Sequence, residues 1–169
     1  DYCANINKAR KKNGEEPFKP IFGCEMYVAR RRKENKVKDM HDNSGYHLIV
    51  LAKNYQGYKN LIKLVSHSWV DGFYYRPRTD RVDLEKYHEG LIVCSACLAG
   101  EIPRNILKGD MNAARETVEW YKKVFGDDFY LELQRHEVKD PTLVANRDAF
   151  PLQQKVNRVL LQFAKEYNI

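Results

Sequence analysis

Three side chains in this sequence, Glu25, His47 and Cys97, are of the types that bind divalent metal ions. Glu25 interrupts the otherwise apolar stretch KPIFGCEMYV of residues 19–28, which is typical of a buried strand. A buried carboxylate is costly unless it is paired, protonated or bound to a metal. We therefore expect Glu25 to have a partner elsewhere in the chain.

His47 is the first candidate partner, because it lies at the start of a second apolar stretch, YHLIVLA, at residues 46–52. The polar linker of residues 30–45 has no helical periodicity, so an antiparallel return of the chain is favoured over a parallel crossover. That return would bring Glu25 and His47 together on neighbouring strands. A carboxylate and a neutral imidazole in that position can hold a divalent metal.

Cys97 is the third candidate, since it lies at the end of the apolar stretch LIVCSACL of residues 91–98, where α/β proteins carry their sites. Each candidate has an ordinary alternative. Cys97 alone would be a small buried hydrophobe, and His47 alone a hydrogen-bonded core histidine. Glu25 alone would pair with an arginine.

A separate candidate site is the loop GFYYRPR of residues 72–78, where aromatic rings alternate with arginines. We expect nucleic-acid contacts from Tyr74, Tyr75, Arg76 and Arg78, by stacking and by binding phosphate. The alternative is a loop whose aromatics pack on the core and whose arginines are solvated. The net charge of +6 fits a polyanionic partner but also fits solvated helix faces, so charge alone decides little.

Length and composition indicate one domain over residues 1–169, with 43% hydrophobic residues to build a core. The sequence has no apolar run near the ~20 residues of a membrane span and no signal-peptide pattern, so we expect a soluble, cytoplasmic protein without a membrane partner. We expect the cysteines to be free thiols. The CxxC spacing of Cys94 and Cys97 lacks a second CxxC, so a zinc knuckle is weakly supported.

The elements that must position these residues alternate between strands and helices. Apolar periodicity predicts strands at 19–28, 46–52, 91–98 and 129–133, and helices at 1–14, 58–69, 100–109, 110–125 and from about Pro141 to 167. This order is typical of a mainly parallel α/β fold. The first two strands are apolar on both faces, so we expect a sheet covered on both sides.

Five segments, KPIFGCEMYV, YHLIVLAKNYQGYKNLIKLVS, GFYYRPRTD, GLIVCSACLAGEIP and FYLELQRH, together resemble the polymerase and histidinol phosphatase (PHP) domain of bacterial DNA polymerase III alpha subunits. The resemblance covers nearly the whole chain and implies part of a distorted (β/α)7 barrel, truncated at both ends. It also implies a cluster of divalent metals, zinc, manganese or magnesium, in the intact domain. By resemblance Glu25 is the glutamate of the GCE element, His47 the HL histidine and Cys97 the cysteine of SGCL.

The same resemblance implies a function. The intact domain would hydrolyse phosphoesters, in some bacteria as a 3′–5′ proofreading exonuclease, or would keep the site as a structural relic. The parent would be a DNA-directed DNA polymerase, a nucleotidyltransferase of DNA replication whose partners are DNA, a proofreading exonuclease subunit and the sliding clamp. A docking module for the proofreading subunit and a stand-alone phosphoesterase are the alternatives.

The sequence also departs from the family pattern. The family's HxH, TDH and TNDxH elements and the polymerase palm lie outside residues 1–169, so no catalytic set is complete here. We expect this chain alone to be inactive and to bind metal weakly. SACL replaces SGCL, and Thr79 stands where an aliphatic residue follows PR, which puts the packing of that loop in question.

Overall fold

The computed structural model describes residues 1–140 and 142–169, apart from the side chains of residues 145 and 146. Its sheet has the order β3-β1-β2-β4-β5, formed by β1 (Gly23–Ala29), β2 (Gly45–Ala52), β3 (Arg78–Thr79), β4 (Leu91–Cys94) and β5 (Phe129–Tyr130). β2 pairs antiparallel with β1 and β4, whereas β3 and β5 pair parallel with β1 and β4. All strands except β2 therefore run the same way, which confirms the mainly parallel α/β fold. The sheet is open, as in part of a barrel.

The principal helices are α1 (Tyr2–Lys12), α2 (Tyr55–Val70), α3 (Arg81–Lys86), α4 (Glu101–Lys108), α5 (Met111–Phe125) and α6 (Phe150–Tyr167). Capping side chains begin three of them. Asn54, Asp80 and Asp110 each accept a hydrogen bond from a backbone N–H three residues on, at 2.9–3.0 Å. Gly109, with φ +82°, ends α4. In the described part of the chain, no helix has the length and apolar character needed to cross a membrane.

Most predicted elements are confirmed with shifted ends, and one strand and one α-helix were missed. β3 and α3 are only two and six residues long, too short to give a periodic signal. The predicted strand at 91–98 ends at Cys94, and the strand at 129–133 ends at Tyr130. The last helix begins at Phe150, and its predicted start, Pro141, lies outside the described residues.

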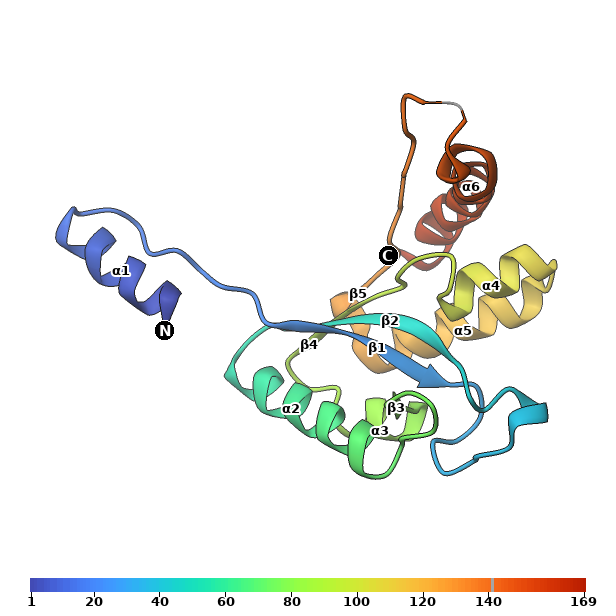
Figure 1. Ribbon diagram of the computed structural model, residues 1–169, viewed down its shortest axis with the longest axis horizontal. Coiled ribbons are helices and arrows are strands. Elements are labelled where there is room, and N and C mark those ends of the chain that lie inside the picture. Colours follow the sequence, from blue (N-terminus) through green and yellow to red (C-terminus); the bar gives the residue numbers. More distant parts are fainter. Residues whose placement is uncertain (141) are drawn as a thin grey trace.

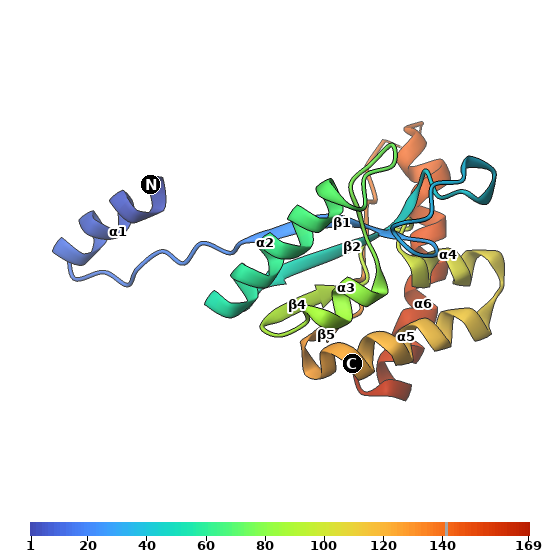
Figure 2. The same cartoon turned by 90° about the horizontal axis from the view of Figure 1, so that it is seen from below.

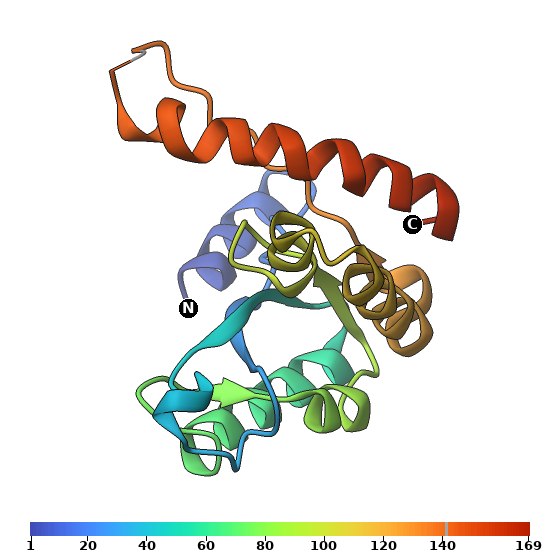
Figure 3. The same ribbon diagram turned by 90° about the vertical axis from the view of Figure 1, so that its right-hand side faces the viewer.

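One face of the sheet carries the hydrophobic core. Met26, Val28, Leu48, Val50 and Val93 are at most 4% exposed on this face. They pack in one cluster with side chains from α2 to α6. Figure 1 shows α2 and α3 below the sheet, and Figure 3 shows α6 crossing α4 and α5. By contrast, α1 buries no residue and lies apart from the sheet, beyond the extended segment 13–22 (Figures 1 and 2).

The opposite face of β1 and β2 is only half covered, so the predicted two-sided coverage is wrong. Tyr27, His47 and Ile49 are partly exposed there, and the Glu25 side chain is 56% exposed. The prediction of a buried Glu25 is therefore wrong as well. Glu25 therefore stays in contact with solvent.

Thr79 justifies the concern about packing near the loop of residues 72–78. It is fully buried in β3 beside Val28, and its Oγ1 has no hydrogen-bond partner among the described residues. A buried unsatisfied hydroxyl costs about 1–3 kcal/mol.

We predict that Thr79→Val raises the free energy of unfolding by about 1 kcal/mol, because valine keeps the shape and removes the unpaired hydroxyl. Urea denaturation measures the change. Thr79→Ala is the control and should not stabilise, since it also removes a buried methyl group. Loss of stability in the valine variant would contradict the prediction.

Candidate metal centre

The Glu25, His47 and Cys97 side chains meet on the half-covered face of the sheet. Glu25 Oε1 lies 2.7 Å from His47 Nδ1, and Cys97 Sγ lies 3.6 Å from the same nitrogen. One ligand atom from each residue lies within 4.8 Å of the other two. The predicted approach of Glu25 and His47 is confirmed, and Cys97 joins them. Glu25 pairs with the imidazole and not with an arginine.

The pairing of β1 with β2 positions the first two residues. Its register sets Tyr27 opposite His47 and Glu25 opposite Ile49. Side chains on a strand alternate between faces, and those directly opposite each other share one face. Glu25 and His47 are therefore diagonal neighbours on one surface, as the predicted antiparallel return requires.

The turn after β4 brings Cys97 to the same surface. The backbone N–H of His47 donates to the carbonyl oxygen of Ala99 at 3.1 Å, and this bond ties the turn to β2. Within the turn, the backbone N–H of Ala99 donates to Cys97 Sγ at 3.4 Å. The turn thus fixes the thiol beside the imidazole.

Two small residues allow this turn. Ala96 is 3% exposed and has φ +60°, a conformation that favours glycine and costs other residues about 1–2 kcal/mol. This explains why a glycine suits that position in SGCL, and why SACL keeps the turn only with strain. A Cβ added to Gly100 would lie 2.2 Å from the carbonyl oxygen of Ser95, so a larger residue there would displace the turn.

The neighbouring thiols of Cys24 and Cys94 have raised pKa values. Burial, with a smaller contribution from the Glu25 charge, raises the pKa of the Cys24 thiol. Burial and then the Glu132 charge raise the pKa of the Cys94 thiol. Both therefore stay protonated at neutral pH. All four cysteines of the chain are free.

The chemistry of the three grouped side chains fits a divalent metal ion. A carboxylate, an imidazole and a thiol are the ligand types of zinc sites, and three protein ligands leave one position open. Glu25 supplies a negative charge to offset that of a cation. Because this face is half exposed, a substrate could reach the open position.

The loop of residues 72–78 divides into an exposed part and a buried part. Tyr75 is 62% exposed, Arg76 is exposed and Tyr74 is partly covered. Arg78 is 0% exposed and donates to backbone carbonyl oxygens. The predicted nucleic-acid contact from Arg78 is therefore wrong, because its guanidinium is inside the protein and its donors are already bound.

One further side chain near the centre, that of Tyr27, and one beyond β5, that of His136, were missed. The Tyr27 ring lies edge-on to the His47 ring, with centroids 4.9 Å apart. Its position two residues after Glu25 was an available signal. His136 follows the last strand, and Gln153 contacts its Nδ1 at 3.0 Å. Gln153 lines the same narrow cavity as Cys97.

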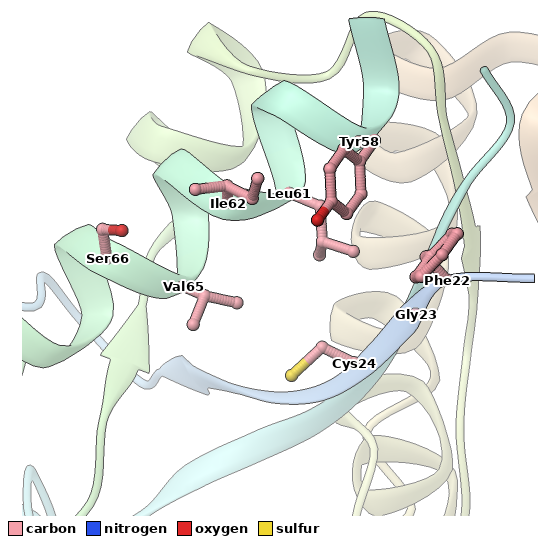
Figure 4. A pocket seen from close by; sticks show the side chains of 8 residues that line it. All are labelled: Phe22, Gly23, Cys24, Tyr58, Leu61, Ile62, Val65 and Ser66. Carbon is pink, nitrogen blue, oxygen red and sulfur yellow. The ribbon is translucent and has the colours of Figure 1, made fainter. Parts of the chain in front are cut away.

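A larger apolar cavity, of about 330 Å³, lies elsewhere. Figure 4 shows it between α2 and the start of β1, with the Cys24 side chain directed toward it. Cys24 and Glu25 alternate along β1, so this cavity lies on the opposite face from Glu25. Of its lining side chains, only those of Cys24 and Tyr58 can ionise. Its lining therefore lacks the carboxylate and the imidazole found around His47.

Comparisons with known proteins agree with the geometry. The family model of the PHP domain matches residues 1–136. The chain is 55% identical over 140 residues to the DNA polymerase III subunit alpha of Borreliella burgdorferi, which covers 83% of the chain and 12% of that protein. The same subunit of Thermus aquaticus is 38% identical over 152 residues, with 89% of the chain and 12% of the relative covered.

A third relative is the DNA polymerase III subunit alpha of Aquifex aeolicus, 40% identical over 159 residues, with 91% of the chain and 13% of the relative covered. The chain thus spans only about an eighth of the length of these curated relatives. The match includes all three grouped side chains, since Glu25, His47 and Cys97 lie within the residues that the family model covers.

Proposed function

This chain belongs to the PHP domain family, and from that membership we propose that it forms the central part of the PHP domain of a DNA polymerase III alpha subunit. The observation that carries the proposal is the meeting of Glu25, His47 and Cys97 from three separate segments, with ligand atoms within 4.8 Å. These three residues would supply part of a divalent-metal centre for phosphoester hydrolysis.

The thiol favours zinc over magnesium or manganese, because soft thiolate ligands select zinc whereas carboxylates suit the harder ions. A bound divalent ion would activate water and offset charge that develops on phosphodiester oxygens. Glu25 contributes compensating charge, and its Oε1 lies 2.7 Å from His47 Nδ1. The turn after β4 holds Cys97 in place against β2.

The activity of the whole protein is part of the proposal. We propose a DNA-directed DNA polymerase of DNA replication, which acts on DNA together with other replicase subunits, including a proofreading exonuclease subunit and the sliding clamp. The ligand set within residues 1–169 is incomplete in this proposal. The chain alone would then lack 3′–5′ exonuclease activity and bind metal weakly.

Metal content tests the proposal. We expect a longer version of the protein, extended through the segments that flank this region in its relatives, to hold more than one metal ion per chain by mass spectrometry. His47→Ala should lower that occupancy, because it removes the imidazole at the centre of the group. His88→Ala is the matched control, since His88 is exposed and outside the group.

Two results would overturn the proposal. A longer protein without metal would indicate a structural platform, in which the pairing of Glu25 with His47 has replaced the ion. Equal occupancy in the His47→Ala and His88→Ala variants would place the metal elsewhere.

A further inference from the structure

Arg76 is a cation without an anionic partner beside the candidate metal centre. Its guanidinium Cζ lies 5.0 Å from the centroid of the Tyr27 ring, and Nη1 donates to Tyr27 Oη at 2.8 Å. Among the described residues no carboxylate pairs with it, although several other arginines have one. The Arg76 charge is thus held in a fixed place and not neutralised.

Tyr27 connects this cation to the metal centre. Its ring stands edge-on to His47 at 4.9 Å between centroids and shares a face with Glu25. The Tyr27 ring thus contacts the Arg76 guanidinium at 5.0 Å on one side and the His47 imidazole at 4.9 Å on another. One ligand could therefore contact both groups.

The loop that presents Arg76 is fixed at both ends. A Cβ added to Gly72 would lie 1.9 Å from the carbonyl oxygen of Arg78, and Arg78 Nε donates to the carbonyl oxygen of Gly72 at 3.0 Å. Between them Tyr75 has φ +61°, which is strained for a residue with a large side chain. Tyr75 is 62% exposed.

We propose that Arg76, held on Tyr27, binds a backbone phosphate of single-stranded DNA while Tyr75 stacks on a neighbouring base. An exposed guanidinium and an exposed aromatic ring on one rigid loop are the two elements of single-strand recognition. Arginine binds phosphate in a bidentate geometry. The proposal rests on the proposed function, since it orients a strand toward the group formed by Glu25, His47 and Cys97.

The chain offers a matched control in Arg30. Its Cζ also lies 5.0 Å from a tyrosine ring, that of Tyr46, and its Nε donates to the Ser44 hydroxyl at 3.0 Å. Tyr46 pairs with Val28, so this second arginine–tyrosine stack lies on the opposite face of the sheet. Arg30→Gln removes the same charge and the same type of stack, away from the metal centre.

The test is the binding of fluorescein-labelled oligothymidylate to this chain, followed by fluorescence anisotropy in EDTA over a range of KCl concentrations. We expect Arg76→Gln to weaken binding about tenfold and to reduce the slope of log K against log[salt] by about 0.7, the value for one lost phosphate contact on a single strand. Arg30→Gln should leave the slope nearly unchanged, and Tyr75→Leu should weaken binding without altering the slope. Circular dichroism verifies that each variant is folded.

Equal losses for Arg76→Gln and Arg30→Gln would overturn the inference, because binding would then follow net charge. No detectable binding by the native chain would overturn it as well. EDTA keeps the result independent of the metal centre. If the longer protein holds no metal but Arg76→Gln still weakens DNA binding, only the proposed function is refuted. If the longer protein holds metal but Arg76→Gln does not weaken DNA binding, only this inference is refuted.

Discussion

Replacement of Arg78 by leucine should remove a large part of the protein's free energy of unfolding. The Arg78 guanidinium donates to the backbone carbonyl oxygens of Gly72, Asn35, Asp42 and Lys33, at 2.5–3.2 Å. These bonds tie the linker between β1 and β2 to the loop of residues 72–78. Leucine would fill part of the space but donate to none of these oxygens.

The expected loss is at least about 4 kcal/mol, because each buried group left unsatisfied costs about 1–3 kcal/mol. Domains of this size are stable by only about 5–15 kcal/mol. Burial lowers the pKa of the Arg78 guanidinium, so the native structure bears a desolvation cost that the four hydrogen bonds offset. Urea denaturation, followed by the fluorescence of Trp69 and Trp120, measures the change.

Arg76→Leu is the control, since Arg76 lies two residues earlier in the same loop and is exposed. It should change the free energy of unfolding by less than about 1 kcal/mol, as surface substitutions usually do. Arg78→Lys should fall between the two, because an ammonium group keeps the charge but not the planar fork of donors. Similar unfolding midpoints for Arg78→Leu and Arg76→Leu would refute the assigned role of Arg78.

The contrast between Arg76 and Arg78 shows where prediction from sequence stops. Both are arginines of one motif, and nothing local distinguishes them. What separates them is the linker between β1 and β2, whose carbonyls surround Arg78 from positions 36–45 residues earlier in the sequence. Such long-range surroundings leave no periodic signal, and β3 was missed for the same reason, since its pairing with β1 defines it.

The meeting of Glu25 and His47 at the candidate metal centre was more predictable, because local rules position these residues. The two-residue period of strands and the absence of a helix between β1 and β2 were enough to bring Glu25 to His47. The exposure of Glu25 was predicted wrongly, because it depends on what covers that face of the sheet. The strain at Ala96 was invisible as well, since backbone angles of a turn are set by the contacts of the turn with β2.

The second large effect concerns the choice of metal. In the longer version of the protein, we expect Cys97→Asp to lower zinc affinity at least about 100-fold, because even residues that only support a metal ligand change affinity 10–100-fold when replaced. Manganese affinity should be kept or increased, since a carboxylate suits harder ions than a thiolate does. Competition with a chromophoric chelator measures zinc, and electron paramagnetic resonance measures manganese.

Cys94→Ser is the matched control, because Cys94 is the other thiol of the CxxC pair but lies outside the group of ligand atoms. Its burial raises the pKa of the thiol, so it should not act as a thiolate ligand, and its replacement should leave zinc affinity nearly unchanged. Equal zinc affinity in the native protein and the Cys97→Asp variant would show that Cys97 is a packing residue. A strong loss of zinc affinity in the Cys94→Ser variant would show that Cys94, and not Cys97, supplies the thiolate. The proposal expects zinc affinity to fall only in the Cys97→Asp variant, while manganese affinity is retained. That result would agree with a centre in which the thiol selects the metal and Glu25 and His47 hold it.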